Sequence, residues 1–357
     1  MSENPINKAY SEFESAVKKL GLPEQLLRSE PLKKYTTWRV GGPADFFVDV
    51  GTVDSMAALV KAAIAYKIPY YILGGGSNVL IGDKGFRGLV LKNSISSWEL
   101  VDDPRLAQEW EDHITGESRH TAVHFHYYTD AGDPNYGAEQ VFLKVSSGYS
   151  MASLIRETLD KGITGLEKFT RIPGTLGGWI YNNTHGHTQF IGDFIHEVRS
   201  LQPDGMIMTR SWKDLEFGYD MSIFHFNDEI ILDAVLRLFK GDIGKAKEIA
   251  VEVMKSKMQR QPSNSGGCVF LNVTPDEKAK NDFESDAVGY IVDKQLGWLG
   301  THKVGGAWIS DKHGNFIETD GTATAADIIA VIDLVREECK KRYGVELREE
   351  IFRVGEF

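Results

Sequence analysis

The sequence predicts an α+β fold that is large enough for more than one domain. The 357 residues can enclose a substantial core, and 42% hydrophobic with 25% charged residues is ordinary for a globular protein. Strand-like and helix-like segments follow one another along the chain, and glycine-rich turns interrupt them at three places. These observations predict both helices and strands, connected in part by tight, glycine-rich turns.

The first part of the chain predicts a helix and then a strand–helix–strand unit. Apolar residues at helical spacing predict a helix over residues 8–28. Strands at 46–50 and 70–73 flank a helix at 53–66, a glycine loop follows the second strand, and another strand lies at 89–91. This order of elements is typical of an α/β unit.

The middle of the chain begins with polar, charged residues at 98–137, which we interpret as a surface insertion with a strand at 124–128. Regular structure resumes after it. A helix is predicted at 150–161, with Gly162 as its C-cap. Strands are predicted at 142–145, 198–202 and 230–238.

The last third predicts helices and short strands in alternation. A helix at 244–258 leads into a glycine-containing turn. Further helices are predicted at 288–295 and 325–342, and strands at 305–309, 316–318 and around 345–354.

Charge and cysteine content exclude several classes of protein. The net charge of −11 and a pI of about 5.5 argue against a nucleic-acid binder, which needs a basic face. Two cysteines are too few for a disulfide framework or a cysteine zinc site. The N-terminus is polar and no run of 18 apolar residues occurs, so we expect a cytoplasmic protein without membrane insertion.

A glycine loop at residues 74–78 follows the predicted strand that ends at Leu73. Successive glycines reach positive φ cheaply and let backbone N–H groups converge on an anion, while Ser77 and Asn78 add side-chain donors. The spacing matches neither G-x-G-x-x-G nor the P-loop. By itself, the loop fits an anion cradle and a plain tight turn equally well.

Two more glycine clusters strengthen the ligand hypothesis. One lies at residues 171–179 and contains Pro173-Gly174 and Gly177-Gly178, and the other lies at 38–44 and contains Gly41-Gly42. Each of them alone is consistent with a tight bend or close packing. Three such surfaces together suit a long ligand with a diphosphate and a planar ring.

Six segments in order resemble one family. They are residues 36–44, 73–80, 172–178, 266–272, 305–317 and 346–350. These segments resemble the UDP-N-acetylenolpyruvoylglucosamine reductases (MurB), and the match runs from about residue 33 to 355. The chain lacks the extra tyrosine-bearing loop that some members carry, so it is closer to the shorter-loop branch.

The resemblance implies a fold of the vanillyl-alcohol-oxidase/PCMH type, with FAD bound by a two-subdomain domain and a C-terminal α/β domain that binds the substrate. We expect an N-terminal helical segment over 1–32, an FAD-binding domain over 33–240 that is split near 96, and a substrate domain over 241–357. The implied flavin contacts are Trp38, Val40, Gly41, Gly42, Leu73, Gly74, Gly75, Gly76, Ser77, Asn78, Ile172, Pro173, Gly174, Thr175, Gly177, Gly178 and Asn183.

The implied activity is the NADPH-dependent reduction of UDP-N-acetylglucosamine enolpyruvate to UDP-N-acetylmuramate. The enzyme would be a UDP-N-acetylmuramate dehydrogenase of peptidoglycan synthesis, and hence of cell-wall biogenesis, cell shape and cell division. We expect a monomer that binds a small UDP-sugar. The residues that match substrate-side positions are Tyr219, Ser222, Asn272 and Lys312.

Two residues match the family's catalytic positions. The reaction needs a proton as well as a hydride, and Cys268 stands where the family carries its proton donor. A thiol with a pKa of about 8.5 is mostly protonated at neutral pH. Glu350 matches the catalytic glutamate, although its neighbour Glu349 leaves the register open by one residue. The alternatives are a small buried thiol, which is also our interpretation of Cys339, and a solvated acidic turn.

Three segments depart from the family. Asp220 stands where an arginine is expected, and Leu271 where lysine is frequent. Arg171, Arg260, Lys303, His225 and His187 are the cations considered as replacements for that arginine. Where many members read N-x-G-A-Y-G, this chain has His185 and His187, which we expect to supply hydrogen-bond donors or positive charge near the flavin; no acidic or cysteine ligand accompanies them, so no metal site is predicted.

These departures keep two other hypotheses open. One is a different flavin-dependent oxidase or reductase on the same scaffold. The other is a catalytically silent protein that binds flavin or a UDP-sugar. The presence of both Cys268 and Glu350 argues against the silent binder, because simple binding requires neither.

Overall fold

The computed structural model describes residues 5–103, 105–106, 133–135, 137–186, 189–262 and 264–357. The predicted strand at 124–128 and His187 lie outside these ranges. Contacts divide the chain into two compact units, and every segment of one unit is separated in sequence by segments of the other. Unit 1 comprises Met1–Gln25, Val48–Gly75 and Leu91–Lys255, and unit 2 comprises Leu26–Phe47, Gly76–Val90 and Ser256–Phe357. The predicted domain boundary near residue 241 stays a prediction.

Unit 1 begins with a pair of helices, α1 (Pro5–Lys19) and α2 (Val53–Ala65). The two helices meet where the ring centroids of Phe13 and Tyr66 lie 6.4 Å apart. The predicted α2 is confirmed, and Thr52 caps it by accepting a hydrogen bond from the N–H of Ser55. The prediction that the first helix reaches residue 28 is wrong, because the helix stops before Gly21, which has a φ of +65°.

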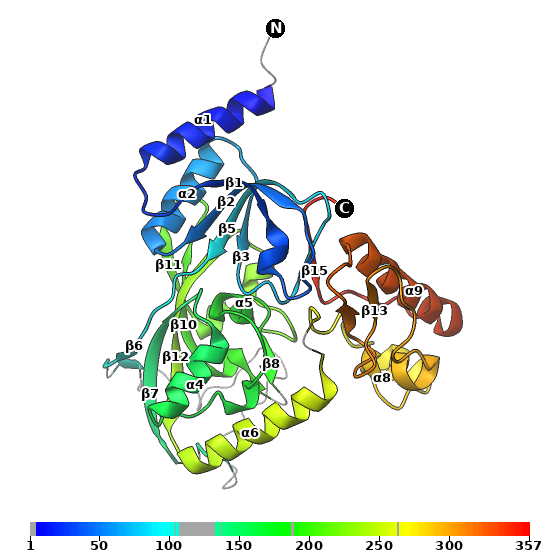
Figure 1. Cartoon of the computed structure of the whole chain (residues 1–357). Coiled ribbons are helices and arrows are strands. Elements are labelled where there is room, and N and C mark those ends of the chain that lie inside the picture. Colours follow the sequence, from blue (N-terminus) through cyan, green and yellow to red (C-terminus); the bar gives the residue numbers. More distant parts are fainter. Residues whose placement is uncertain (1–4, 104, 107–132, 136, 187–188, 263) are drawn as a thin grey trace. The chain divides into compact units, whose positions relative to one another are not determined.

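A five-stranded antiparallel sheet forms the centre of unit 1, in the order β11-β10-β12-β7-β6 (Figure 1). The three central strands confirm the predictions, whereas the two edge strands were missed. Both edge strands are short and largely exposed, so their sequences carry little hydrophobic alternation. The strands are β6 (Trp98–Val101), β7 (Glu139–Ser146), β10 (Ile195–Leu201), β11 (Ile207–Ser211) and β12 (Ile230–Lys240).

The helices α4 (Met151–Asp160) and α5 (Leu176–Tyr181) pack on this sheet. Leu154 and Trp179 join the strands in one apolar core, to which α6 (Ile243–Arg260) also contributes. The predicted helices α4 and α6 are confirmed. Short elements lie between them: η2 (Glu167–Phe169), β8 (His185–Gly186), β9 (Gln189–Phe190), η3 (Ile191–Phe194), η4 (Trp212–Asp214) and η5 (Ile223–His225).

A second sheet has four strands in the order β1-β2-β5-β3. Its strands are β1 (Leu27–Pro31), β2 (Pro43–Val50), β3 (Tyr70–Leu73) and β5 (Phe86–Asn93), and the short helix η1 (Leu32–Tyr35) follows β1. Strands β2 and β5 each run from unit 2 into unit 1 along the chain. All three strands predicted in this region are confirmed, and β1 occupies residues that we expected at the end of the first helix.

In unit 2, the end of the chain pairs with the strand that follows the glycine loop. Strand β15 (Phe352–Val354) lies parallel to β4 (Val79–Ile81), with Phe352 opposite Val79. The predicted final strand at 345–354 is therefore confirmed only for its last three residues. Strand β4 was missed, because we assigned no element between the glycine loop at 74–78 and the strand at 89–91.

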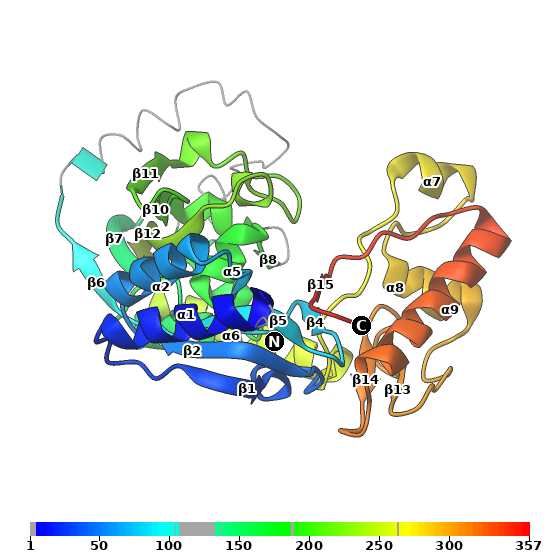
Figure 2. The same ribbon diagram turned by 90° about the horizontal axis from the view of Figure 1, so that it is seen from above.

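The rest of unit 2 is a small helical layer around the hairpin of β13 (Ala307–Ile309) and β14 (Ile317–Thr319), with α9 next to β13 (Figure 2). Helix α9 (Ala325–Tyr343) is confirmed; Thr324 and Asp327 cap its start, and Gly344 ends it with a φ of +67°. The other helices are α7 (Pro275–Lys280), α8 (Val288–Tyr290) and its π-helical continuation η6 (Ile291–Leu296). Within the described ranges, no helix is both long and apolar enough to cross a membrane.

One buried carboxyl in unit 1 makes stability depend on pH. Asp193 is 1% exposed, and its Oδ2 accepts a hydrogen bond from the N–H of Phe190 at 2.8 Å. Burial raises the pKa of Asp193 to about 7, and the bond from Phe190 and the charge of Arg237 oppose this only in part. The folded protein therefore keeps this proton at pH values where the unfolded chain has released it.

We predict that Asp193→Asn stabilises the protein increasingly as the pH rises from about 4 to about 8. The ordinary carboxyl pKa is 3.8 and the folded value is about 7, so the wild type loses stability across this window and the variant does not. The upper limit is about 4 kcal/mol, at about 1.4 kcal/mol per pKa unit. Urea unfolding at both pH values measures the difference. Glu252→Gln, an exposed site, is the control, and an equal effect at both pH values would contradict the prediction.

Candidate active site

Two glycine segments that are a hundred residues apart in sequence lie against each other in unit 1. A methyl group placed on Gly75 would lie 2.7 Å from Cα of Gly174. One placed on Gly74 would lie 2.8 Å from Oγ1 of Thr175. No larger residue fits at either place unless the backbone moves, because side-chain carbons do not approach other atoms this closely. The structure thus brings together two of the three predicted glycine surfaces.

Hydrogen bonds to Met151 and Ser147 hold the second of these segments, residues 171–179, in place. The N–H of Met151 donates to the carbonyl of Gly174 at 3.1 Å, and the N–H of Gly177 donates to that of Ser147 at 2.7 Å. Gly148, which the sequence interpretation missed, belongs to the same close contacts, since a methyl on it would lie 2.7 Å from Oδ1 of Asn93. A glycine directly after a strand and before a helix cap was the available signal. Ile172 is half-buried, and Pro173 and Gly178 are exposed.

The third glycine surface lies in unit 2, against the end of the glycine loop. Gly76 has a φ of +65°, and a methyl on it would collide with the carbonyl oxygen of Tyr35. The N–H of Thr37 donates to the carbonyl of Gly76 at 3.0 Å. Gly41 has a φ of +125°, and Gly42 donates its N–H to the carbonyl of Gly82 at 2.9 Å. The segment 36–42 and the loop residues 76–82 therefore form one backbone surface.

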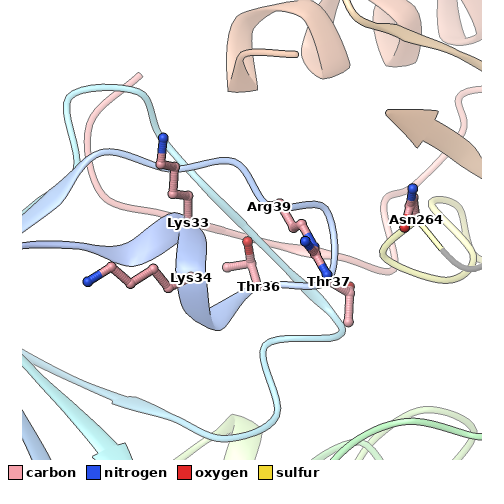
Figure 3. Close-up of a pocket in the computed structure, with 6 residues that line it drawn as sticks. All are labelled: Lys33, Lys34, Thr36, Thr37, Arg39 and Asn264. Atoms are coloured by element: carbon pink, nitrogen blue, oxygen red, sulfur yellow. The ribbon is translucent and has the colours of Figure 1, made fainter. Parts of the chain in front are cut away.

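A pocket of about 460 Å³ opens beside this surface. Three basic residues line it together with hydroxyl and amide groups (Figure 3). Lys33 and Lys34 point in different directions, and Lys34 is paired with Glu30 at 2.9 Å. The lining suits an anionic group such as a diphosphate. The sequence interpretation did not select these cations; the lining residues are Lys33, Lys34, Thr36, Thr37, Arg39 and Asn264.

Trp38 and Val40 belong to the apolar core of unit 2. Both are buried, and the indole Nε1 of Trp38 donates to the carbonyl of Ile317 at 2.8 Å. Gly266 lies flat on the indole, because a methyl on Gly266 would be 2.6 Å from the ring. The indole therefore supports the turn that precedes Cys268. A cofactor contact at Trp38 would have to come from its backbone.

The structure brings the two predicted catalytic residues together within unit 2. The N–H of Glu350 donates to the carbonyl of Val269, the residue after Cys268, at 2.8 Å. Next to this bond, Phe270, which follows Val269, forms an antiparallel bridge with Glu349, which precedes Glu350. The side chains of Cys268 and Glu350 are both half-buried. Residues that are 82 positions apart in the sequence thus sit on paired segments, as the reaction hypothesis requires.

Asn315 fastens the segment that carries Cys268. Its Oδ1 accepts hydrogen bonds from the N–H groups of Val269 at 3.2 Å and Phe270 at 2.9 Å, and its Nδ2 donates to the carbonyl of Phe270 at 2.8 Å. The N–H of Asn315 in turn donates to Nδ1 of His313 at 3.2 Å. Burial, followed by the charge of Arg260, lowers the pKa of His313 and keeps this nitrogen an acceptor. Sequence reasoning missed Asn315, although it lies within a matched segment.

The glycine loop is tied to Glu350 as well. Nδ2 of Asn78 donates to the carbonyl of Glu350 at 3.2 Å, and the N–H of Phe352 donates to the carbonyl of Asn78 at 3.0 Å. Glu349 forms ion pairs with Arg336 and Arg353. Two guanidinium groups engage Glu349, so its carboxylate helps to hold this part of unit 2 together; the assignment of Glu350 as the functional carboxylate stays a prediction.

A loop at residues 217–222 lies at the end of α5 in unit 1. Asn183 is buried; its Nδ2 donates to the carbonyl of Gly218 at 2.8 Å and its Oδ1 accepts from the N–H of Gly192 at 3.0 Å. Ser222 is also buried and donates its hydroxyl to the carbonyl of Tyr181 at 2.7 Å. Both side chains therefore position the loop, while Tyr219 on the same loop is 54% exposed.

Asp220 is paired with His185, whose Nδ1 lies 3.1 Å from its Oδ1. Of the cations considered as replacements for the arginine, Arg171 is exposed and Lys303 pairs with Asp320 at 3.1 Å. Burial lowers the pKa of His225 more than the nearby charge of Asp220 raises it. Arg260 hydrogen-bonds Ser256.

The remaining predicted substrate residues lie in unit 2. Asn272 and Leu271 are half-buried, and the carbonyl of Asn272 accepts a hydrogen bond from Arg348 at 3.1 Å. Lys312 is exposed on a turn, where its N–H donates to Oγ of Ser310 at 3.0 Å. Cys339 is buried in α9, where burial raises its pKa to about 12, as befits a core thiol.

Family comparisons agree with this geometry. A family model for the C-terminal domain of UDP-N-acetylenolpyruvoylglucosamine reductase matches residues 259–354, which contain Cys268, Asn315 and Glu350. A model for an FAD binding domain matches residues 135–211, which contain the glycine segment of α5.

Similar proteins extend over nearly the whole chain. The UDP-N-acetylenolpyruvoylglucosamine reductase of Chlamydia felis is 31% identical over 331 residues, which cover 92% of this chain and 94% of that protein. The reductase of the same name from Bacillus pumilus is 29% identical over 335 residues, with 93% and 95% covered. The crystal structure of UDP-N-acetylenolpyruvylglucosamine reductase (MurB) from Thermus caldophilus superposes with a TM-score of 0.66 at 25% identity, over 93% of this chain and 98% of that chain. The predicted fold class is thereby confirmed.

We predict that Gly75→Ala lowers the affinity for flavin at least about tenfold, since the added methyl meets the backbone of Gly174. Titration of the flavin-free protein with FAD, followed by flavin fluorescence, measures this affinity. Gly51→Ala is the matched control, because the nearest atom to its methyl is Oε1 of Glu24 at 3.6 Å. A Gly75→Ala variant that binds FAD as tightly as the control would show that this glycine contact does not belong to the cofactor site.

Proposed function

The chain belongs to the UDP-N-acetylenolpyruvoylglucosamine reductase family, and on this premise we propose that it reduces UDP-N-acetylglucosamine enolpyruvate to UDP-N-acetylmuramate. FAD is the bound cofactor and NADPH the hydride donor. The observation that carries the proposal is the pairing of the Cys268 and Glu350 segments through the bond from Glu350 to Val269 at 2.8 Å. This pairing unites an acid and a carboxylate from two distant stretches of sequence.

The glycine surfaces fit a flavin cofactor. In unit 1, Gly74 and Gly75 leave no room for a methyl against Thr175 and Gly174, so the two segments lie in close contact there. In unit 2, Gly76 and the pocket with Arg39 supply backbone and positive charge for a diphosphate. When bound, the flavin supplies the hydride for one alkene carbon, and the protein supplies the proton and orients the substrate.

Cys268 is proposed to deliver the proton to the neighbouring carbon. An ordinary thiol has a pKa of about 8.5 and carries its proton at neutral pH, so it is a stronger acid than a serine hydroxyl. Asn315 fixes the backbone on the C-terminal side of the thiol with three hydrogen bonds. Gly267, with a φ of +85°, sets the turn on its N-terminal side. Because the backbone is fixed on both sides, the thiol is held in position to transfer its proton to carbon.

Glu350 is proposed to shape the charge around the intermediate, in which negative charge spreads onto the substrate carboxylate. Its backbone is anchored on both sides, by Val269 and by Asn78. Tyr219, Asn272 and Lys312 are proposed substrate contacts, while Ser222 acts by holding the loop that bears Tyr219.

The cellular setting follows from the proposed reaction. The product is a peptidoglycan precursor, so the protein would serve cell-wall synthesis and, through it, cell shape and division. We propose that it works as a monomer in the cytoplasm, where its nucleotide substrates are made.

A second candidate function is another flavin-dependent oxidase or reductase with a different substrate. Asp220 is the specific observation that favours it, because a carboxylate in this loop puts negative charge close to a predicted substrate contact, Tyr219. The pairing of Asp220 with His185 reduces the weight of this argument, since the carboxylate already has a partner in β8.

We predict that the purified protein is yellow and that it oxidises NADPH only when UDP-N-acetylglucosamine enolpyruvate is present. The measurement is the substrate-dependent loss of NADPH absorbance. A colourless protein that does not take up FAD would refute the flavin assignment. A yellow protein that NADPH reduces, but that this substrate does not reoxidise, would instead support the second candidate.

We predict that Cys268→Ala slows reoxidation of the flavin by substrate by about 10²-fold or more, because the positioned proton is lost. Reduction of the flavin by NADPH needs no such proton and should stay nearly unchanged. Stopped-flow measurement of the two half-reactions separates the effects. Cys339→Ala, at the buried thiol, is the control and should leave both rates alone. Equal losses in both half-reactions would exclude Cys268 as the proton donor.

A further inference from the structure

The indole of Trp38 lies against the turn at residues 264–268, which carries Cys268 and is called the Cys268 turn below. Both belong to unit 2, and the side chain of Trp38 is completely buried. A methyl group on Gly266 would lie 2.6 Å from Cζ3 and Cη2 of the indole and 2.8 Å from Cε3. These three carbons are neighbours on the six-membered ring, so the backbone at Gly266 rests on the face of that ring.

Hydrogen bonds to strand β14 hold the indole in this place. Its Nε1 donates to the carbonyl of Ile317 at 2.8 Å, and the hydroxyl of Thr319 donates to the carbonyl of Trp38 at 3.0 Å. The N–H of Thr319 also donates to the carbonyl of Asn264 at 3.3 Å. Strand β14 therefore anchors both the indole and the first residue of the Cys268 turn.

The backbone around Trp38 is fixed as well. Arg39 has a φ of +57°, a left-handed conformation that residues other than glycine keep only where surrounding contacts enforce it. The N–H of Arg39 donates to the carbonyl of Thr36 at 3.2 Å, and the hydroxyl of Thr36 donates to the carbonyl of Val40 at 3.0 Å. Trp38 is thus held in the core while its neighbours Thr37 and Arg39 line the pocket (Figure 3). A side chain fixed in this way is a rigid support.

The contact with the indole explains why residue 266 is a glycine. The φ of Gly266 is not positive, so its backbone conformation is open to other residues, whereas Gly267 has a φ of +85°. What excludes a side chain at Gly266 is the ring face of Trp38. On the other side of Cys268, Asn315 holds the backbone with three hydrogen bonds. The thiol therefore lies between two fixed points, and the indole is the one on its N-terminal side.

We propose that Trp38 is a positioning residue for proton transfer from Cys268: its ring face sets the position of Gly266 and thereby the direction of the thiol. This inference rests on the proposed function. In the step concerned, the S–H bond of Cys268 breaks, and its proton goes to the carbon beside the one that received the hydride. The electron pair on that carbon forms the new C–H bond, and the remaining thiolate takes a proton from water. A misplacement of about 1 Å can slow such a step about 10²-fold, so the support of the turn governs its rate.

Two substitutions change the contact from opposite sides. Trp38→Phe keeps an aromatic ring but removes the outer carbons on which Gly266 rests, and Gly266→Ala adds the methyl that meets the ring. Each should slow flavin reoxidation by substrate about tenfold in stopped-flow measurements. Flavin reduction by NADPH should stay nearly unchanged. Phe283→Leu is the matched control, since it shortens another buried ring of the same core, which packs on Tyr343 at 5.0 Å, and both rates should stay as in the wild type.

Combined substitutions separate positioning from general damage. Once Trp38→Phe has withdrawn the ring, Gly266→Ala should do little further harm, so the double variant should be faster than the product of the two single losses predicts. In the Cys268→Ala background, neither substitution should slow reoxidation further, because the thiol that they place is gone. A merely structural role would lower the rate by the same factor with and without the thiol, and that result would overturn the inference.

Alkylation of Cys268 supplies a readout that needs neither substrate nor turnover. Iodoacetamide labelling of the protein as purified, quantified by mass spectrometry, reports how readily the Cys268 turn opens. Trp38→Phe and Gly266→Ala should each label Cys268 at least about fivefold faster than the wild type, because the support of the turn is lost. Phe283→Leu should label it at the wild-type rate. Cys339, which is 1% exposed, reports global unfolding and should stay unlabelled. Equal labelling of Cys268 in all of these proteins would contradict the proposal.

The outcomes distinguish this inference from the proposed function. If the substrate does not reoxidise the wild-type flavin, the proposed function fails, and the role of Trp38 in proton transfer fails with it. If the wild type is reoxidised and both folded single variants are reoxidised just as fast, the inference alone is overturned. If Trp38→Phe does not fold, Gly266→Ala carries the test, with and without Cys268.

Discussion

The parallel hydrogen bonding of β15 to β4 is the interaction on which the rest of unit 2 depends. It sets the end of the chain beside the strand that follows the glycine loop, with Phe352 opposite Val79. Asn78 can reach the carbonyl of Glu350 only because the two strands are in register. Glu350 then pairs with Val269 and so fixes the segment of Cys268. One short backbone ladder thus determines where both proposed catalytic side chains lie.

In unit 1, the corresponding constraint is the close approach of backbone to backbone. Gly75 and Gly174 touch without side chains between them, and a methyl on Gly177 would lie 2.9 Å from Cβ of Ser147. Contacts of this kind tolerate no added carbon, which is why they appear as glycines in the sequence. They also explain why a surface built from such segments presents N–H and C=O groups in fixed directions, as recognition of a planar, phosphate-bearing cofactor requires.

Long periodic helices and buried strands were predictable, because their side chains repeat with the period of the element; α9 and β12 are examples. Edge strand β11 is exposed and was missed, and the first helix was drawn too long because Leu27 continued its apolar pattern. In the site, glycines and Cys268 were visible as local motifs. Asn315 and the partnership of His185 with Asp220 were not, since each depends on a partner that is distant in sequence.

The pairing of β4 with the end of the chain has a consequence for synthesis. Asn78 and Glu350 are 272 positions apart. At roughly 5–20 residues per second, the ribosome needs about 14–54 s between the two. During that interval, β4 lacks its partner strand β15, so the ladder between them is not formed. The native pairing of β4, and with it the hydrogen bond from Asn78 to Glu350, can therefore form only after residues 350–354 have been synthesised.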